Sequence, residues 1–120
     1  MSSSGSILVV EDQDSARESL VELLRGEGYE VHEAADGDEA IAKVNRLDLD
    51  VVLTDLMMPG IDGIAVLKHV RDISPQTLVI LMTAHASVET AVEAIRAGAQ
   101  DYLLKPLIFA DVLRKVQNLM

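Results

Sequence analysis

The stretch DVVLTDLMMPGIDG, residues 50–63, contains the pattern that decides the fold. Its apolar run at residues 51–53 has the composition of a strand that is buried on both faces of a parallel sheet. The period then changes, because Ile64, Leu67 and Val70 fall on one face of a helix. A buried strand followed by an amphipathic helix is the repeating unit of an α/β protein.

The same unit repeats on both sides of this stretch. Runs rich in Val, Ile and Leu predict strands at residues 7–10 and 78–82, and weaker candidates lie at 29–34 and 101–104. Between the runs lie four more helical stripes, formed by Ala16, Leu20, Leu23 and Leu24; by Ala40, Ile41, Val44 and Leu47; by Val88, Ala91, Val92 and Ile95; and by Val112, Leu113, Val116 and Met120. Five strands alternating with five helices predict an α/β fold, a doubly wound parallel sheet in the flavodoxin-like order 2-1-3-4-5 with helices on both faces.

Helix ends are visible in the sequence as capping signals. Ser15 followed by Glu18 has the spacing of a capping box, and Asp36 with Glu39 gives a second such start. Ser87 is expected to open the fourth helix, and Gly98 is expected to follow its end as a C′ glycine.

Charge and composition narrow the function classes. The 120 residues correspond to one domain, with 20 acidic against 10 basic residues and a net charge of −10. Such a chain repels nucleic acid and anionic membranes, so neither is expected as a direct partner. For most of these acids, a plain contribution to solubility is the alternative interpretation.

The absence of cysteine excludes disulfides and thiolate metal sites. The apolar runs are far shorter than the roughly 20 residues that span a bilayer. Residues 1–6, MSSSGS, lack the features of a signal peptide and are expected to form a disordered leader before a domain at 7–120. The expected compartment is the cytoplasm.

Polar side chains follow four of the predicted strands. Glu11 and Asp12 follow the first strand, and Asp55 follows the third. Thr83 follows the fourth strand, and Lys105 follows the fifth. Ligand sites of doubly wound sheets form at the carboxyl ends of the strands, so these five side chains are expected to converge.

Three neighbouring carboxylates need a cation. Each pair at about 4 Å costs roughly 4 kcal/mol at an effective dielectric near 20, and one lysine does not neutralise three acids. Mg²⁺ prefers oxygen ligands, whereas Zn²⁺ is disfavoured because no His or Cys adjoins the cluster at ligand spacing. With Lys105 and Thr83 as further contacts for phosphoryl oxygens, the set suits phosphoryl transfer to an aspartate nucleophile.

Each of these residues alone has a simpler interpretation. An aspartate after a strand, such as Asp55, is usually a turn or cap residue. Glu11 and Asp12 could be solvated loop acids, Thr83 a cap and Lys105 a surface lysine. Only the joint arrangement at four strand ends favours a site.

The blocks ILVVEDQDSARESL, DVVLTDLMMPGIDG and LVILMTAHASVETAVEAIRAGAQDYLLKPL resemble the receiver domain of bacterial two-component response regulators. The resemblance runs from residue 7 to residue 120. The last block is most similar to receivers of the nitrogen-regulatory type, which usually precede an ATPase and a DNA-binding domain. The chain ends after the last predicted helix, so we expect it to be a domain of a longer regulator.

The resemblance implies a role for each matching position. Asp55 is implied as the phosphoacceptor, Asp12 as a direct Mg²⁺ ligand, Glu11 as a ligand through water and the Met57 carbonyl as the third protein ligand. Thr83 is implied as the switch hydroxyl and Lys105 as the partner of the phosphoryl group. The remaining implied roles are Tyr102 as the aromatic that follows Thr83, a cis bond before Pro106, a turn at Pro59 and Gly60, and Gly63 at the start of the third helix.

The resemblance also implies partners and a mode of action. A sensor histidine kinase would donate the phosphoryl group, and the domain would catalyse only its own phosphorylation and slow dephosphorylation. The signal would leave through the surface of the fourth helix, fifth strand and fifth helix, by homodimerisation or by contact with an output domain, with Val88 and Tyr102 taking part. Met57 and His85 flank the expected path of the hydrolytic water, where Met57 is expected to slow hydrolysis and His85 to modulate it; simple loop packing is the alternative.

Three other functions share part of this pattern. An aspartyl-phosphate hydrolase of the haloacid dehalogenase type needs an acid two residues after the nucleophile, where this chain has Met57. A flavin module is disfavoured by the two Tyr, one Phe and absent Trp. A receiver-like docking module that is never phosphorylated remains the alternative function.

Overall fold

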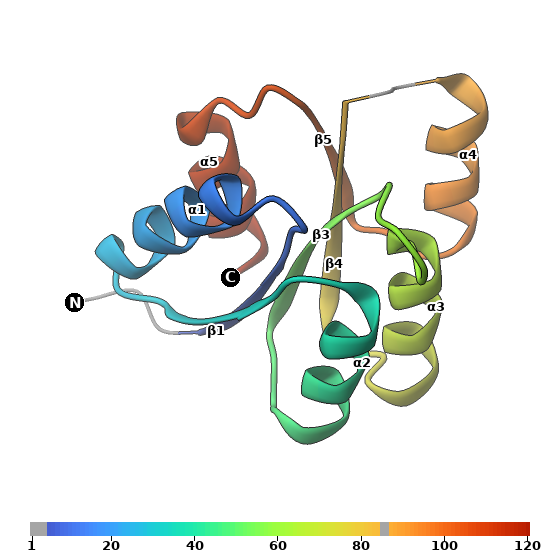
Figure 1. Ribbon diagram of the computed structural model, residues 1–120, viewed down its shortest axis with the longest axis horizontal. Helices are drawn as coiled ribbons and strands as arrows, with labels where there is room; N and C mark the ends of the chain where they lie inside the picture. Colours follow the sequence, from blue (N-terminus) through green and yellow to red (C-terminus); the bar gives the residue numbers. More distant parts are fainter. Residues whose placement is uncertain (1–4, 85–86) are drawn as a thin grey trace.

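The computed structural model describes residues 5–84 and 87–120. Strands and helices alternate along the chain as β1 (Ser6–Val10), α1 (Asp14–Gly26), β2 (Glu30–Ala34), α2 (Gly37–Arg46), β3 (Val51–Asp55), α3 (Gly63–Ile73), β4 (Leu78–Thr83), α4 (Val88–Arg96), β5 (Asp101–Leu104) and α5 (Phe109–Leu119) (Figure 1). All paired strands are parallel, and the sheet order is β2-β1-β3-β4-β5. The predicted topology is therefore confirmed.

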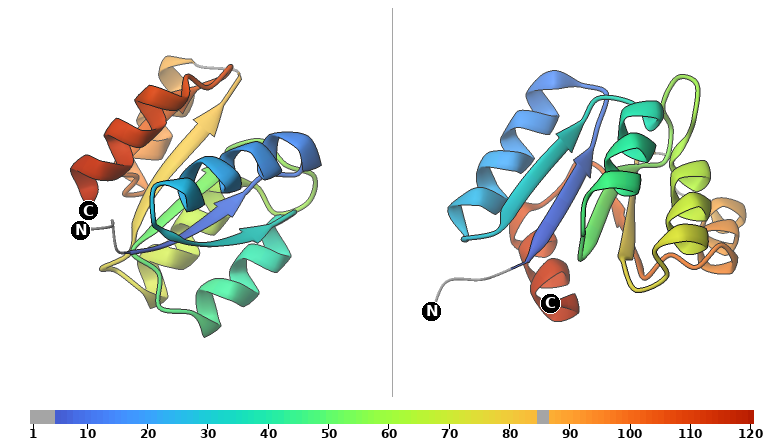
Figure 2. Two further views of the ribbon diagram at one scale, coloured as in Figure 1. Left: turned by 90° about the vertical axis from the view of Figure 1, so that its left-hand side faces the viewer. Right: turned by 90° about the horizontal axis from the view of Figure 1, so that it is seen from below.

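The sheet lies between two layers of helices. Helices α1 and α5 cover one face and α2, α3 and α4 cover the other, as the two further views in Figure 2 also show. Successive strand residues point to opposite layers: Leu8 and Val10 pack with α2 and α3, whereas Ile7 and Val9 pack with α1 and α5. Burial on both faces explains why the strands are continuous apolar runs rather than alternating ones.

Two helix starts differ in how well the sequence predicted them. The Asp36 cap of α2 is confirmed, because its side chain accepts from Glu39 N at 2.8 Å. The other half of the predicted capping box differs, because Glu39 Oε1 accepts from Ala35 N at 2.7 Å rather than from Asp36 N. The capping box at Ser15 is wrong, because α1 begins at Asp14 without a side-chain cap. An ion pair of 2.7 Å between Arg17 and Asp14 spans that first turn instead.

Helix α4 has the predicted ends but not a core-facing stripe. Ser87 and Thr90 form a capping box, and Gly98 has the left-handed φ of +99° that a C′ glycine favours. Val88 and Ile95, however, are 81% and 72% exposed, and Ala94 is the buried residue of this helix. The apolar stripe of α4 thus faces outward and leaves an exposed apolar surface.

Ser6 does not belong to the leader that was expected at residues 1–6. Ser6 belongs to β1, where its N–H donates to Asp50 Oδ2 at 2.8 Å and its hydroxyl donates to Glu30 Oε2 at 3.0 Å. Residues 1–4 lie outside the described part of the chain. Within the described ranges, no helix has the length and apolar character required to cross a membrane.

Candidate phosphoryl-transfer site

Asp55 lies at the carboxyl end of the central strand β3 and is 6% exposed. Backbone pairing holds it in place, because β3 lies between β1 and β4, and the next residue, Leu56, donates its N–H to Met82 O at 2.8 Å. A central strand buried on both faces leaves its last side chain little freedom to move. The carboxylate is therefore fixed at the edge where ligand sites of this topology form.

Glu11 and Asp12 follow β1 and bring two more carboxylates to Asp55. One ligand oxygen from each of the three acids lies within 4.8 Å of the others. Glu11 is 2% exposed, and its Oε2 accepts from Gln13 N at 3.1 Å, whereas Asp12 is exposed. The structure thus brings together the three acids that the sequence analysis predicted as a cluster.

Lys105 supplies a cation to this cluster from the end of β5. Its Nζ lies 2.5 Å from Glu11 Oε1 and 2.9 Å from Asp55 Oδ1. The Lys105–Pro106 peptide bond is cis, as the resemblance implied, and Lys105 N donates to Thr83 O at 2.8 Å. Strands β1, β3 and β5 therefore contribute to one pocket, although their residues are far apart in the sequence.

The buried charges shift the pKa values of the three groups. Burial is the largest influence on Asp55 and raises its pKa to about 7; Lys105 opposes the rise and the Glu11 carboxylate adds to it. Burial also acts to raise the pKa of Glu11, but the hydrogen bonds from Lys105 and the other neighbours outweigh it and lower that pKa. Burial acts to lower the pKa of Lys105, but its two carboxylate partners raise it. The protein alone thus holds an ionised Glu11–Lys105 pair beside an Asp55 carboxylate that is costly to ionise.

This donor set suits a hard divalent cation. Carboxylate oxygens within reach of one ion are what Mg²⁺ binds, and the exposed Asp12 leaves one side open to water and ligand. A second positive charge beside Lys105 would offset the repulsion between Glu11 and Asp55. The residues therefore fit the magnesium ion that the sequence predicted.

Gly63 lets helix α3 approach strand β3 closely. A Cβ atom at this position would lie 2.2 Å from Asp55 O and 2.9 Å from Leu56 Cα, so any larger residue would displace the backbone next to Asp55. Gly63 N also donates to Leu56 O at 2.9 Å. Gly60, in the turn before α3, has a left-handed φ of +79°. The turn and helix start implied for this stretch are both present.

Thr83 and Tyr102 lie on adjacent strands beside the pocket. Thr83 ends β4 and is 1% exposed. The Tyr102 hydroxyl lies 3.3 Å from Thr90 Oγ1 of α4. Tyr102 therefore connects the strand next to Thr83 with the helix that carries the exposed apolar stripe.

Met57 and His85 were the two predicted rate-tuning residues. The Met57 side chain is 64% exposed in the loop between β3 and α3, where it is open to solvent rather than packed. His85 lies outside the described residues.

Arg17 is not among the site residues predicted from the sequence. Its Nη1 donates to the Glu11 carbonyl at 2.9 Å, directly behind the acid pair. The sequence contains one signal for it, which is the i, i+3 spacing from Asp14 in the first turn of α1. Its contact with Glu33 Oε1 at 3.0 Å depends on the pairing of β1 with β2 and has no local signal.

Comparisons with known proteins agree with this geometry. The family model described as "Response regulator receiver domain" matches residues 7–117. Among curated relatives, the transcriptional regulatory protein ZraR of Salmonella typhimurium is 50% identical over 103 residues, which are 86% of this chain and 23% of that protein. The regulatory protein AtoC of Escherichia coli is 46% identical over 112 residues, which are 93% of this chain and 24% of that protein. This chain thus spans about a quarter of the length of these relatives.

Solved structures share the whole architecture. The CheY-like receiver domain protein from Methanospirillum hungatei superposes with a TM-score of 0.93 at 33% identity, covering 97% of this chain and 93% of that one. The response regulator TrrA from Thermotoga maritima, solved in complex with Mg²⁺-BeF, has a TM-score of 0.88 at 35% identity, covering 97% of this chain and 99% of that one.

Proposed function

The chain belongs to the response regulator receiver family, and on that premise we propose that it accepts a phosphoryl group on Asp55 in a two-component phosphorelay, with Mg²⁺ as cofactor. The donor is the phosphohistidine of a sensor kinase or phosphotransfer protein. The observation that carries the proposal is the pocket in which Asp55, Glu11 and Asp12 approach within 4.8 Å of one another, with Lys105 Nζ 2.9 Å from Asp55 Oδ1.

In the proposed reaction an Asp55 oxygen attacks the phosphorus atom. The bond between phosphorus and the donor histidine nitrogen breaks, and an acyl phosphate forms on Asp55. Lys105 is already placed to contact an oxygen of the transferred group, and Thr83 at the end of β4 would donate to another. Positioning and charge neutralisation are the main requirements of phosphoryl transfer, so no further catalytic side chain is needed.

The magnesium ligands are the acids of the pocket. Asp12 and Asp55 would bind the ion directly, Glu11 through water, and the Met57 backbone carbonyl would complete the protein ligands. The bound ion supplies charge neutralisation for the transferring phosphoryl group. The Glu11 carboxylate raises the pKa of Asp55, and this repulsion, which a bound cation would relieve, supports the assignment.

The added charge would act on the surface of α4, β5 and α5. Thr83 and Lys105 would move toward the phosphoryl group, and the Tyr102 side chain would move into the space that Thr83 vacates. Tyr102 contacts Thr90 of α4, so its movement reaches the helix with the exposed residues Val88 and Ile95. A shift between two arrangements of this surface would then control an output, either a homodimer or a domain of a longer transcriptional regulator.

Incubation with acetyl phosphate and Mg²⁺ tests the site. Mass spectrometry should show the gain of one phosphoryl group in the wild type and none in Asp55→Asn. A phosphoryl gain that survives the substitution would overturn the assignment. No gain in the wild type, with Mg²⁺ binding intact, would favour the alternative of a docking module that is never phosphorylated.

The lifetime of the acyl phosphate tests the roles of Met57 and His85. We propose that the apolar Met57 side chain slows the hydrolytic water and that His85 modulates it. Met57→Asn should shorten the half-life of the phosphorylated protein, and His85→Ala should change it. Unchanged half-lives in both variants would refute a rate-tuning role for the two residues.

A further inference from the structure

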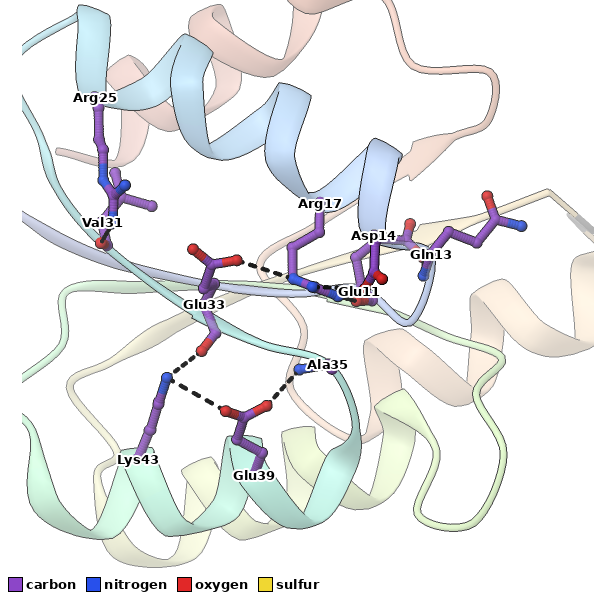
Figure 3. Close-up of polar contacts among 10 residues, drawn as sticks. All are labelled: Glu11, Gln13, Asp14, Arg17, Arg25, Val31, Glu33, Ala35, Glu39 and Lys43. Atoms are coloured by element: carbon purple, nitrogen blue, oxygen red, sulfur yellow. Dashed lines mark hydrogen bonds and ion pairs between the residues drawn. The ribbon is translucent and has the colours of Figure 1, made fainter.

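Arg17 joins three separate parts of the structure beside the acid pocket. Its Nη1 donates to the Glu11 carbonyl at 2.9 Å, its Nε donates to Glu33 Oε1 at 3.0 Å and its Nη2 donates to Asp14 Oδ1 at 2.7 Å (Figure 3). The side chain is only 13% exposed, although arginine is usually a surface residue. One guanidinium thus connects the end of β1, the first turn of α1 and strand β2.

Asp12 depends on these contacts because its own side chain is unsupported. It is exposed and makes no side-chain hydrogen bond or ion pair with any residue in the described ranges. The direction of its Cα–Cβ bond is set by the backbone on either side. Glu11 N donates to Ala34 O at 3.1 Å, the Glu11 carbonyl accepts from the guanidinium, and Arg17 N donates to Gln13 O at 2.9 Å. The Arg17 guanidinium contacts the backbone before Asp12, and the main-chain N–H of Arg17 contacts the backbone after it.

Glu33, the residue that Arg17 contacts on β2, is itself bonded to helix α2. Glu33, which accepts from Arg17, lies on β2, and its backbone carbonyl accepts from Lys43 Nζ of α2 (Figure 3). Lys43 Nζ in turn lies 3.6 Å from Glu39 Oε2, and Glu39 Oε1 accepts from Ala35 N at 2.7 Å. Arg17 therefore contacts the side chain of a residue whose backbone lies in β2 and is also held by Lys43 of α2.

We propose that Arg17 is a positioning residue for the metal site: it fixes the turn at residues 11–13 and thereby orients Asp12 for Mg²⁺. The inference rests on the proposed function, because it concerns the same ion. Groups behind metal ligands commonly alter affinity on the order of 10-fold to 100-fold when they are removed. Three donors in a fixed planar fork perform this task, so lysine should not replace Arg17.

Simple electrostatics makes the opposite prediction. Removing a positive charge near three carboxylates should tighten Mg²⁺ binding, because the ion is then repelled less. Loss of positioning should weaken binding instead. The sign of the change therefore separates the two effects.

The test is calorimetric titration of the full chain with Mg²⁺ alone, comparing wild type, Arg17→Met and Arg25→Met. Arg25 is the matched control, because it lies on the same helix and also reaches β2, where its Nη2 donates to Val31 O at 2.9 Å (Figure 3). Thermal unfolding in EDTA records the structural cost of each change. We expect Arg17→Met to raise the Kd for Mg²⁺ about 10-fold and Arg25→Met to leave it unchanged.

Two further variants keep the test decisive if Arg17→Met folds poorly. Arg17→Lys keeps the charge and should still bind Mg²⁺ several-fold more weakly than the wild type. Glu33→Gln removes the charged anchor on an exposed side chain and should weaken binding in the same direction. Wild-type affinity in these folded variants, or tighter binding in Arg17→Met, would overturn the inference. Absence of Mg²⁺ binding in the wild type would instead refute the proposed function itself.

Discussion

Replacing Asp55 by asparagine should stabilise the metal-free protein at neutral pH. Burial, opposed by Lys105 and reinforced by the Glu11 carboxylate, raises the pKa of Asp55 from 3.8 to about 7. At about 1.4 kcal/mol per pKa unit, this rise sets an upper limit of about 4 kcal/mol on the cost of the ionised carboxylate. Asparagine removes this cost, but it also removes one of the two carboxylate partners of Lys105, which offsets part of the stabilisation. We expect a net stabilisation on the order of 2 kcal/mol above pH 7.

The sign of the pH dependence follows from proton binding. Between about pH 4 and pH 7 the folded wild type holds a proton on Asp55 that the unfolded chain has released. Its free energy of unfolding therefore falls as pH rises through this window, and asparagine does not titrate. The advantage of Asp55→Asn should be small near pH 5 and largest at pH 8.

Urea unfolding in EDTA, followed by circular dichroism at pH 5 and pH 8, measures this difference. With a denaturant slope near 2 kcal/mol/M, the midpoint of Asp55→Asn should lie about 1 M above that of the wild type at pH 8. Asp62→Asn is the control, because Asp62 caps α3 by accepting from Ala65 N at 2.9 Å and asparagine caps a helix equally well. Adding Mg²⁺ should stabilise the wild type more than the variant. A variant that is less stable at pH 8, or a difference that does not grow from pH 5 to pH 8, would refute the reasoning.

Three further substitutions test the packing and charge of the fold. Gly63→Ala should cost about 3 kcal/mol in urea unfolding, because its Cβ would lie 2.2 Å from Asp55 O, whereas Gly26→Ala, with no atom within 4 Å, should be neutral. Lys105→Met should cost about 3 kcal/mol at pH 8 without Mg²⁺, because two buried carboxylates lose their cation, and Mg²⁺ should restore part of the loss. Leu53→Ala should cost about 3 kcal/mol at any pH, because this side chain is 0% exposed in the core.

Specific results would contradict these expectations. Equal midpoints for the two glycine variants would mean that α3 can shift away from Asp55 at little cost. A Lys105→Met protein as stable as the wild type in EDTA at pH 8 would show that the pocket relaxes to admit water. A pH-dependent effect of Leu53→Ala would indicate that the substitution disturbs the acid pocket as well as the core.

Sequence patterns predicted the sheet well because parallel strands leave a strong signature. The strand at residues 101–104 has its predicted bounds, and the other four differ by one or two residues. The extension of β1 has a tertiary cause: Ser6 joins the strand by pairing with Glu30 of β2, which lies 24 residues away in the sequence. The apolar stripe of α4 shows a more serious limit of prediction from sequence. Periodicity identifies an apolar helix face, but it does not indicate whether another element covers that face.

The sequence alone determined the order of elements, the sheet topology and the five strand-end side chains that gather at one edge. These follow from local periodicity and from the rule that parallel strands end on the same side. Only the tertiary structure decided that Lys105 pairs with both Glu11 and Asp55, that α4 exposes its apolar stripe, and that Arg17 contacts both the Glu11 carbonyl and Glu33. The physical reason is that these features depend on residues far apart in the sequence. Periodicity indicates which face a residue occupies on its own helix or strand. Charge pairing and the burial of a helix face depend on distances between elements, which no local pattern contains.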